Sequence, residues 1–345
     1  MNKGMSVMRK IETILVTILM VLGLLLLLCG CQSEAGNQEQ STQEDVISQI
    51  NPYVIKSDIK SYLTKEEEDS FHQLLDAVFR QDEDIELSSD YDSNLRVLSA
   101  LMNNPYYYFV DSVNFHQDYK GLHITYRYSL SEQNQIKESF ENEFLSIINE
   151  EIDPQMNQLD KVLALYHYFA SRLEFDYEYE QQLYGLKDEE IINEIGIFEA
   201  FENNKGVCHT YTFLMEFALA QLDIECLRMS GTLQSNEDVS HMWPVVQIDG
   251  AFYHCDLTWD KNDEQKVGLN YFGMTDQERF ESGIIVDNMV DESYGEVVCE
   301  SDVFQVLRGV EDYEFEKNKG SHIITLHYAD GSDQRYSTQT KSIAE

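Results

Sequence analysis

Cys208, His241 and Asp256 are the residues whose types and order best support covalent chemistry. The cysteine follows Gly206-Val207 and opens an apolar run that predicts a helix. A thiol at a helix N-terminus is favoured as thiolate by unsatisfied N–H groups and by the helix dipole. An imidazole can take the thiol proton, and a carboxylate can orient the imidazole. The competing interpretation is a packed thiol, because free cysteine is among the most buried residue types.

The helix that would carry the thiol has a buried pattern. Apolar residues recur at helical spacing along one face, and they are Tyr211, Leu214, Met215, Ala218 and Leu222. Other apolar side chains fill the remaining faces, and Glu216 is the only charge from Val207 to Leu222. A helix that is apolar on all sides is buried. We therefore expect this helix at the centre of a domain.

His241 and Asp256 fall in two predicted strands, residues 241–248 and 251–260, joined by the strong turn signal Asp249-Gly250. A two-residue turn places the histidine and the aspartate on one sheet face as diagonal neighbours. Their spacing of about 7–8 Å can be closed by polar side chains. An odd turn length would break this shared face. His209 beside the thiol and His254 on the aspartate's face are alternative bases, and His241 is the favoured one.

Three segments together resemble the core of the transglutaminase-like superfamily, and they are Gly206-Val207-Cys208, Ser240-His241-Met242-Trp243 and residues 248–260. Two further segments, Phe175-Asp176-Tyr177 and residues 271–276, resemble motifs that flank this core. The resemblance covers residues 159–276. It implies a papain-related fold in which Cys208 is the nucleophile, His241 the base and Asp256 the orienter.

Two residues depart from the family pattern. Thr210 stands where the family usually has glycine, and Pro244 stands where asparagine is common in bacterial members. Neither change removes a triad atom, but both could reshape the acyl pocket. Proline lacks a backbone N–H for the strand ladder, which predicts an edge or bulged position for Pro244.

The N-terminus has the features of an export signal. Lys3, Arg9 and Lys10 precede a nearly apolar stretch, residues 11–28. Leu28-Cys29-Gly30-Cys31 then resembles a bacterial lipobox, which implies that residues 1–30 are a signal peptide and that Cys31 is lipidated. The alternative is an uncleaved membrane anchor. Either way we expect a membrane-tethered protein on the extracytoplasmic face of a bacterial cell, with residues 31–50 as a disordered tether.

The composition argues against several classes of binding partner. The chain has 345 residues with 24 Lys and Arg against 63 Asp and Glu, a formal charge of −39. So acidic a surface repels nucleic acid and anionic polymers. No Cys-x-x-Cys or His-Glu-x-x-His pattern occurs, so neither a metal nor another cofactor is implied. If Cys208 stays a thiol, Cys226, Cys255 and Cys299 permit at most one disulfide.

The remaining chain predicts an α+β protein in three regions. Residues 51–157 form an N-terminal α+β region with a helix over 58–79, capped inside by Thr64, and with strands at 106–110 and 121–130. Residues 158–280 form the transglutaminase-like core, in which the buried cysteine helix packs on an antiparallel sheet and a polar loop covers 233–240. Residues 281–345 form a β extension whose tail frays from residue 337.

The residues and the resemblance together indicate a cysteine-dependent enzyme. A thioester on Cys208 can be resolved by water, which gives a peptidase or amidase, or by an amine, which gives a protein-glutamine acyltransferase. Hydrolysis of a peptide or protein, at the cell surface, is the favoured prediction. A non-catalytic peptide- or glycan-binding lipoprotein is the remaining alternative.

Overall fold

The computed structural model describes residues 45–88, 90–183, 197–262, 266–287, 294–316 and 319–344. The expected signal peptide, Cys31 and most of the expected tether lie outside these residues. Within the described part, no helix has both the length and the apolar character needed to cross a membrane.

Helices predominate in the first half of the described chain. The α-helices are α2 (Ser57–Tyr62), α3 (Lys65–Arg80), α4 (Tyr91–Met102), α5 (Leu130–Glu151), α6 (Gln158–Arg172), α7 (Tyr177–Leu183), α9 (Ile197–Asn203), α10 (Cys208–Gln221) and α11 (Asp276–Glu281). Short 3₁₀ helices are η1 (Pro105–Phe109), η2 (Gln305–Leu307) and η3 (Lys319–Ser321). Helices α6 and α9 pack against the cysteine helix α10.

Within the described residues, the strands form four separate sheets. In chain order they are β1 (Asp84–Glu86), β2 (Val110–Phe115), β3 (Gly121–Tyr126), β4 (Glu174–Phe175), β5 (Lys205–Gly206), β6 (Cys226–Leu233), β7 (Asn236–Ile248), β8 (Ala251–His254), β9 (Ile284–Asp287), β10 (Val310–Phe315), β11 (Ile323–Tyr328), β12 (Asp333–Ser337) and β13 (Ser342–Ile343). The sheet orders are β1-β3-β2, β4-β5, β8-β7-β6-β9 and β10-β11-β12-β13.

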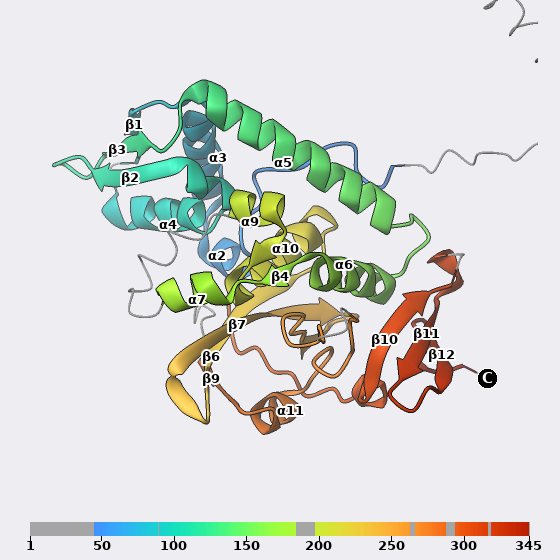
Figure 1. The fold of residues 1–345 in the computed structure, drawn as a ribbon. Helices are drawn as coiled ribbons and strands as arrows, with labels where there is room; N and C mark the ends of the chain where they lie inside the picture. The colour runs from blue at the N-terminus through green and yellow to red at the C-terminus, as the bar shows by residue number, and fades with distance from the viewer. Residues whose placement is uncertain are drawn as a thin grey trace, which may run out of the picture. The chain divides into compact units, whose positions relative to one another are not determined.

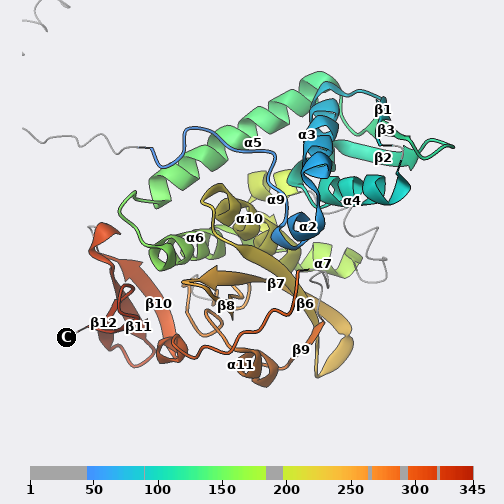
Figure 2. The same ribbon diagram turned by 180° about the vertical axis from the view of Figure 1, so that it is seen from behind.

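The cysteine helix α10 lies between the helical half and the central sheet (Figures 1 and 2). It packs against α6, β6 and β7, and its side chains are buried on almost every face. All pairs in the β8-β7-β6-β9 sheet are antiparallel. The fold is therefore α+β, with a buried cysteine helix on an antiparallel sheet, as the sequence predicted.

The first predicted helix is wrong as a single element. The chain forms α2 and α3, with Leu63 extended between them. Thr64 is also extended because it caps α3: its side chain accepts a hydrogen bond from the N–H of Glu67, and the Glu67 carboxylate accepts one from the N–H of Thr64. The cap was thus identified correctly, and it begins a new helix instead of lying inside one.

The aromatic run at 106–110 is also not a strand, except for Val110. Residues Pro105–Phe109 form η1, and the side chain of Asn104 accepts a hydrogen bond from the N–H of Tyr106. Tyr106 and Phe109 are fully buried. These two rings belong to the core, and a proline at the first helical position sets a helical turn in place of the predicted strand.

Two stretches expected to be irregular are ordered. Residues 233–240 were expected as a loop, but β6 and β7 extend through most of them and pair from Cys226↔Val246 to Leu233↔Asn236. The tail was expected to fray, but β13 pairs with β12. Thr338, between these strands, is buried and donates a hydrogen bond to the carboxylate of Asp160.

The chain contacts the folded part of the protein before residue 50, where the tether was expected to end. The N–H groups of Val46 and Ile47 both donate to Oδ1 of Asn149 on α5, at 2.8 and 3.1 Å. Ile50 is buried in the main core. That core takes residues from all three regions expected from the sequence, and the boundaries at 157 and 280 remain predictions.

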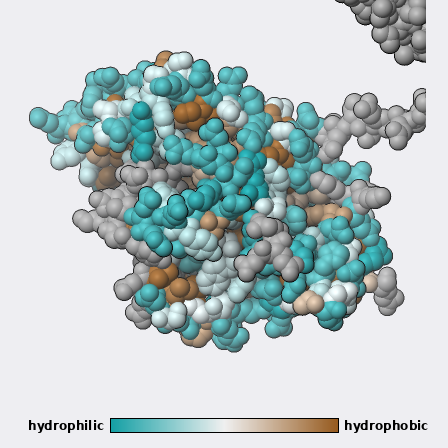
Figure 3. Space-filling model, in the orientation of Figure 1, coloured by the Kyte–Doolittle hydropathy of each residue, from teal (hydrophilic) through white to brown (hydrophobic). Residues whose placement is uncertain are grey.

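The face drawn in Figure 3 is mostly hydrophilic, in keeping with the excess of acidic residues. A hydrophobic patch lies in the region of β6 and β9 (Figure 3). Ile285 and Val286 of β9 are among the exposed large apolar residues, at 40% and 36%.

Candidate active site

Cys208 is placed by a tight entry into α10. The short parallel pair β4 and β5 leads to Val207, which is extended and precedes the helix. The N–H of Val207 donates to Oγ1 of Thr210 at 3.3 Å. A Cβ on Gly206 would lie 2.5 Å from the same oxygen, so this position requires glycine. Thr210, the departure from the family pattern, is therefore part of the entry that sets the thiol at the helix N-terminus.

The hairpin that carries His241 has the predicted register. Asp249 and Gly250 both have positive φ, 52° and 84°, as a two-residue turn of the primed type requires. Ile248 pairs with Ala251, and the β7–β8 ladder ends at Val245↔His254.

Asp256 follows the end of β8 and meets the histidine across the hairpin. Nε2 of His241 lies 2.6 Å from Oδ2 of Asp256, and both side chains are buried. The two residues predicted as base and orienter are therefore in direct contact.

Pro244 occupies a central strand and no bulge, so the expectation of an edge or bulged position is wrong. It pairs with Arg228 inside the regular part of the β6–β7 ladder. Its carbonyl accepts a hydrogen bond from the N–H of Cys255 at 2.9 Å. The backbone nitrogen and carbonyl of Pro244 therefore point toward the chain just beyond the end of β8. The ladder has ended there, so the missing N–H of proline breaks no strand hydrogen bond.

The thiol and the imidazole shift each other's protonation. Burial raises the pKa of Cys208, but hydrogen bonds and charge from His209 and His241 outweigh it and lower this pKa to about 5. Burial lowers the pKa of His241, but the charge and hydrogen bond of Asp256, aided by Cys208, raise it to about 9. Between these values the pair is stable as thiolate and imidazolium, titrating as one coupled system.

Cys208 differs from the other cysteines that the structure describes. Cys208, Cys226, Cys255 and Cys299 are all free and buried. Burial raises the pKa of Cys255 to about 12 and also raises those of Cys226 and Cys299. Only Cys208 of these four has a lowered pKa, because hydrogen bonds and charge from His209 and His241 outweigh its burial.

The two alternative histidines occupy different positions. Nδ1 of His209 lies 3.7 Å from the Cys208 sulfur, so this residue contacts the thiol as well. His254 is buried on β8 and both of its ring nitrogens are engaged elsewhere, because Nδ1 accepts from Nε1 of Trp243 at 2.8 Å and Nε2 lies 2.9 Å from Oδ1 of Asp276. Asp256 contacts His241 and neither alternative, which favours His241 as the base.

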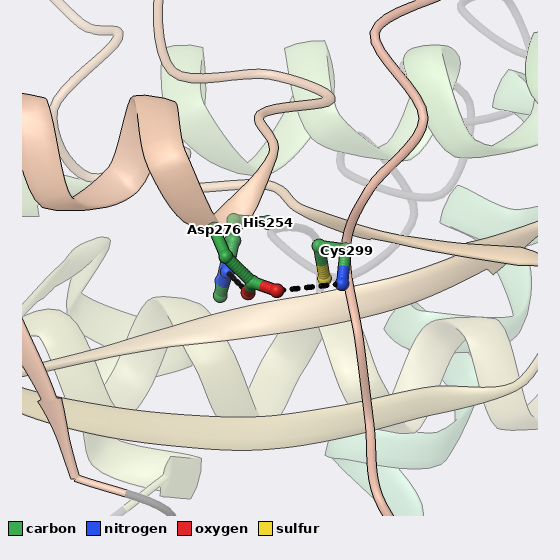
Figure 4. Close-up of side chains that lie close together, drawn as sticks. All are labelled: His254, Asp276 and Cys299. Carbon is green, nitrogen blue, oxygen red and sulfur yellow. Dashed lines mark hydrogen bonds and ion pairs between the residues drawn. The ribbon is translucent and has the colours of Figure 1, made fainter.

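His254, Asp276 and Cys299 lie within metal-ligand distance of one another, with their ligand atoms less than 4.8 Å apart (Figure 4). The indole N–H of Trp243 is only a donor, so Nδ1 of His254 is the lone-pair nitrogen and Nε2 carries the proton toward Asp276. A metal at Nε2 would need an imidazolate, and burial keeps the Cys299 thiol protonated by raising its pKa. The Asp276 carboxylate instead accepts from the N–H of Cys299 at 3.0 Å. We interpret this group as a structural hydrogen-bond chain.

The Thr258-Trp259-Asp260 segment supports the site. The Trp259 ring stacks on His241, with centroids 4.7 Å apart and planes at 15°. Asp260 is buried and accepts from the hydroxyl of Tyr166 at 2.5 Å and from the N–H groups of Asn270 and Tyr271. Burial raises the pKa of Asp260 to about 7. This segment therefore holds the histidine ring and the following loop.

Arg279 is a site residue that the sequence did not reveal. It comes from α11 and is fully buried, and its Nη2 donates to Oδ2 of Asp256 at 3.0 Å. Its guanidinium lies 4.0 Å above the Trp243 ring and 4.7 Å from the Trp259 centroid. An arginine in a short polar helix carries no local pattern that points to a distant carboxylate, so only the tertiary structure identifies it.

Two hollows meet at His241. The first, which we call the aromatic hollow, has a volume of about 280 Å³ and is lined by residues that include Met102, Tyr107, Tyr108, Phe213 and Met242. The second, which we call the acidic hollow, has a volume of about 540 Å³ and is lined by residues that include Glu174, Tyr177, Glu180, Thr258 and Trp259. Ser240 and His241 line both hollows. The two hollows therefore adjoin each other at His241.

Comparison with known proteins finds a matching family model and distantly similar solved structures. A transglutaminase-like domain matches residues 143–263. A candidate cysteine protease from Cytophaga hutchinsonii is 18% identical, with 45% of each chain covered and a TM-score of 0.28. A TGase structure is 17% identical, with 44% of each chain covered and a TM-score of 0.29. The chain thus spans less than half the length of either. No curated protein matches the chain.

The family match contains the helix start with its activated thiol and the hairpin with its paired histidine and aspartate. Residues 143–263 are therefore similar to a transglutaminase-like domain, and the cysteine-enzyme-like site lies within this matched segment.

Proposed function

We propose that the protein is a cysteine-dependent amidase or peptidase that acts on a peptide or protein through a thioester on Cys208. The Cys208 thiolate attacks the amide carbonyl, and the C–N bond breaks as His241 donates its proton to the departing amine. His241 then removes a proton from water, which attacks the thioester and releases the acid. Asp256 holds the imidazole throughout.

One observation carries this proposal: the only described cysteine with a lowered pKa starts a helix whose neighbour is a buried histidine bonded to a buried aspartate. A packed structural thiol has no need of this arrangement, and Cys226, Cys255 and Cys299 lack it. The first turn of α10 also supplies N–H groups without intrahelical acceptors. The N–H of Cys208 itself is suited to stabilise the oxyanion of the tetrahedral intermediate.

Acyl transfer to an amine is the second candidate, and the acidic hollow favours it. Glu174 and Glu180 line this hollow beside His241, and Lys261 also lines it, so the carboxylates outnumber the cation. Burial raises the pKa of Glu180, and the charge of Cys208 raises it further, which reflects how near this carboxylate lies to the thiol. A cationic amine would be attracted to this side and could replace water as the second nucleophile.

We also propose that the enzyme acts outside the cytoplasm, anchored by lipid on Cys31. The support is the sequence of residues 1–31, which lie outside the described part of the structure. Fatty-acid labelling of the chain in bacteria should be lost in Cys31→Ala. Equal labelling of both chains would refute lipidation at this residue.

The test of the chemistry is the rate of alkylation at each cysteine of the full chain under limiting iodoacetamide, measured by mass spectrometry. Cys208 should react fast near neutral pH and Cys226 slowly, and His241→Ala should remove the difference. Peptide amides should then be turned over with Cys208 intact and not in Cys208→Ala, with or without an added amine. Equally slow alkylation of Cys208 and Cys226 in the wild type would refute the enzyme and favour a ligand-binding protein.

A further inference from the structure

Arg279 is notable because its charged group forms an ion pair with Asp256 of the triad. It is fully buried, yet among the described residues the only hydrogen-bond acceptor that it contacts is Oδ2 of Asp256. Nε and Nη1 of Arg279 have no hydrogen-bond partner among the described residues. Buried donors are normally satisfied, so an unsatisfied pair calls for a reason beyond packing.

The surroundings of the guanidinium explain how it tolerates burial. Its planar face lies on the ring of Trp243 and also near Trp259, where the electron-rich faces attract a cation. Both tryptophans also stack on His241, at 5.8 and 4.7 Å between ring centroids. The arginine and the histidine thus share one aromatic frame and one carboxylate oxygen.

The charge balance of the buried group gives the arginine a role. With Cys208 as thiolate, His241 as imidazolium and Asp256 as carboxylate, the three residues carry a net charge of about −1. Asp256 is fully buried, and an uncompensated charge in such a place is strongly unfavourable. Arg279 brings the group to neutrality.

We propose that Arg279 is a positioning residue. Its contact with Oδ2 keeps Asp256 ionised and in place, and Asp256 in turn keeps His241 oriented and charged beside Cys208. The inference rests on the proposed function, because it concerns the same site. Burial alone would raise the pKa of Asp256, and His241 and Arg279 together lower it. Without the arginine, Asp256 would take up a proton at higher pH and the histidine would lose its anionic partner.

Other titratable groups also affect the charges at the site, and none of them is substituted in the Arg279 and Arg308 variants described next. Those whose charge is felt by Cys208, His241, Asp256 or Arg279 are His209 on α10, Glu180 on α7, Tyr166 on α6, His254 on β8, and Asp260 and Tyr271 in the segments that follow β8. None of them forms a hydrogen bond with Oδ2 of Asp256, which contacts His241 and Arg279.

The test compares the pH dependence of Cys208 alkylation in the full chain with that of Arg279→Met, Arg279→Lys and Arg308→Met. Arg308 is the matched control, because it also anchors α11, through Glu278, but does not touch the triad. In Arg279→Met we expect the acid limb to move up by about one pH unit or more, which is a roughly 10-fold slower reaction at the acid end. Arg279→Lys should restore part of the shift, and Arg308→Met should show none.

An unshifted limb in folded Arg279→Met would overturn the inference while leaving an activated Cys208, and with it the proposed function, intact. A wild-type Cys208 without activation would instead overturn the proposed function. If Arg279→Met does not fold, Asp256→Asn and Asp256→Asn/Arg279→Met decide the matter. Charge compensation predicts that removing both charges raises the urea midpoint above that of Asp256→Asn, and a lower midpoint for the double variant would refute it.

Discussion

The two strands of one hairpin carry two buried histidines in opposite protonation states. His241 on β7 and His254 on β8 each contact a carboxylate through Nε2, at 2.6 and 2.9 Å. Yet the pKa of His241 is raised to about 9, whereas burial lowers the pKa of His254 below its usual value. A carboxylate partner alone therefore does not decide whether a buried histidine is charged.

The difference comes from the second ring nitrogen and from the exposure of the carboxylate. Nδ1 of His254 accepts an indole N–H, so it must stay unprotonated, and half of its partner Asp276 is exposed to screening water. The charge of Arg279 lowers the pKa of His254 further. His241 instead has a fully buried aspartate on one side and a thiol that can become an anion on the other. The same residue type is thus a structural acceptor in one place and a charged base in the other.

The largest test of this contrast is to remove each histidine in turn. In His241→Ala the pKa of Cys208 should return toward the ordinary thiol value of 9.0. At pH 7 we expect alkylation of Cys208 to slow by roughly 10- to 100-fold, because the thiolate fraction falls. His254→Ala should change this rate by less than about 2-fold. Similar losses in both variants, measured by mass spectrometry, would erase the distinction.

A pH titration sharpens the same contrast. The native pKa of Cys208, about 5, lies below its unfolded value of 9.0, so this thiolate favours folding above pH 9 and the contribution is lost as pH falls through 5. The raised pKa of His241 stabilises below 6.5 and is lost as pH rises through about 9. We expect half-maximal alkylation of Cys208 near pH 5 and turnover to fall on both sides of the interval 5 to 9. A single midpoint near 9 would contradict the ion pair.

The structural role of His254 can be measured as stability. His254→Leu leaves the indole N–H of Trp243 buried without its acceptor, and we expect a loss of about 1–3 kcal/mol in the free energy of unfolding in urea. His254→Gln retains an acceptor and should lose less. Cys208 alkylation in the folded Leu variant should remain near the wild-type rate. A large fall in that rate would show that His254 on β8 and the triad are energetically coupled.

The turn between the histidines should matter least. Gly250 has a φ of 84°, which an L side chain rarely adopts, so Gly250→Ala should cost about 1 kcal/mol in the free energy of unfolding. Asp249 also has a positive φ, but asparagine accepts that conformation, and Asp249→Asn loses only a half-exposed ion pair with Lys341. We expect its effect to stay below about 0.5 kcal/mol. A change in the alkylation rate of Cys208 in either variant would show that the geometry of the turn affects the thiol.

The sequence predicted the elements whose signals are local. The turn at Asp249-Gly250 fixed the hairpin register, and the apolar run after Cys208 indicated a buried helix. Errors arose where a local signal was ambiguous: the aromatic run at 106–110 suits a strand, but Pro105 and the cap at Asn104 start a 3₁₀ helix. Polar residues at 233–240 suggested a loop, although a strand ladder only needs backbone groups, and the pairing of β6 with β7 carries through them.

By itself, the sequence determined the order of motifs, the register that unites His241 with Asp256, and the placement of Cys208 at a helix start, because each depends on neighbouring residues and on strict periodicity. Only the tertiary structure decided that Arg279 reaches Asp256, that Trp259 stacks on His241, and that His254 is a neutral acceptor. These contacts join separate strands, loops and a helix within one buried space. There, burial and the nearest charge set each protonation state, and no spacing along the chain encodes either.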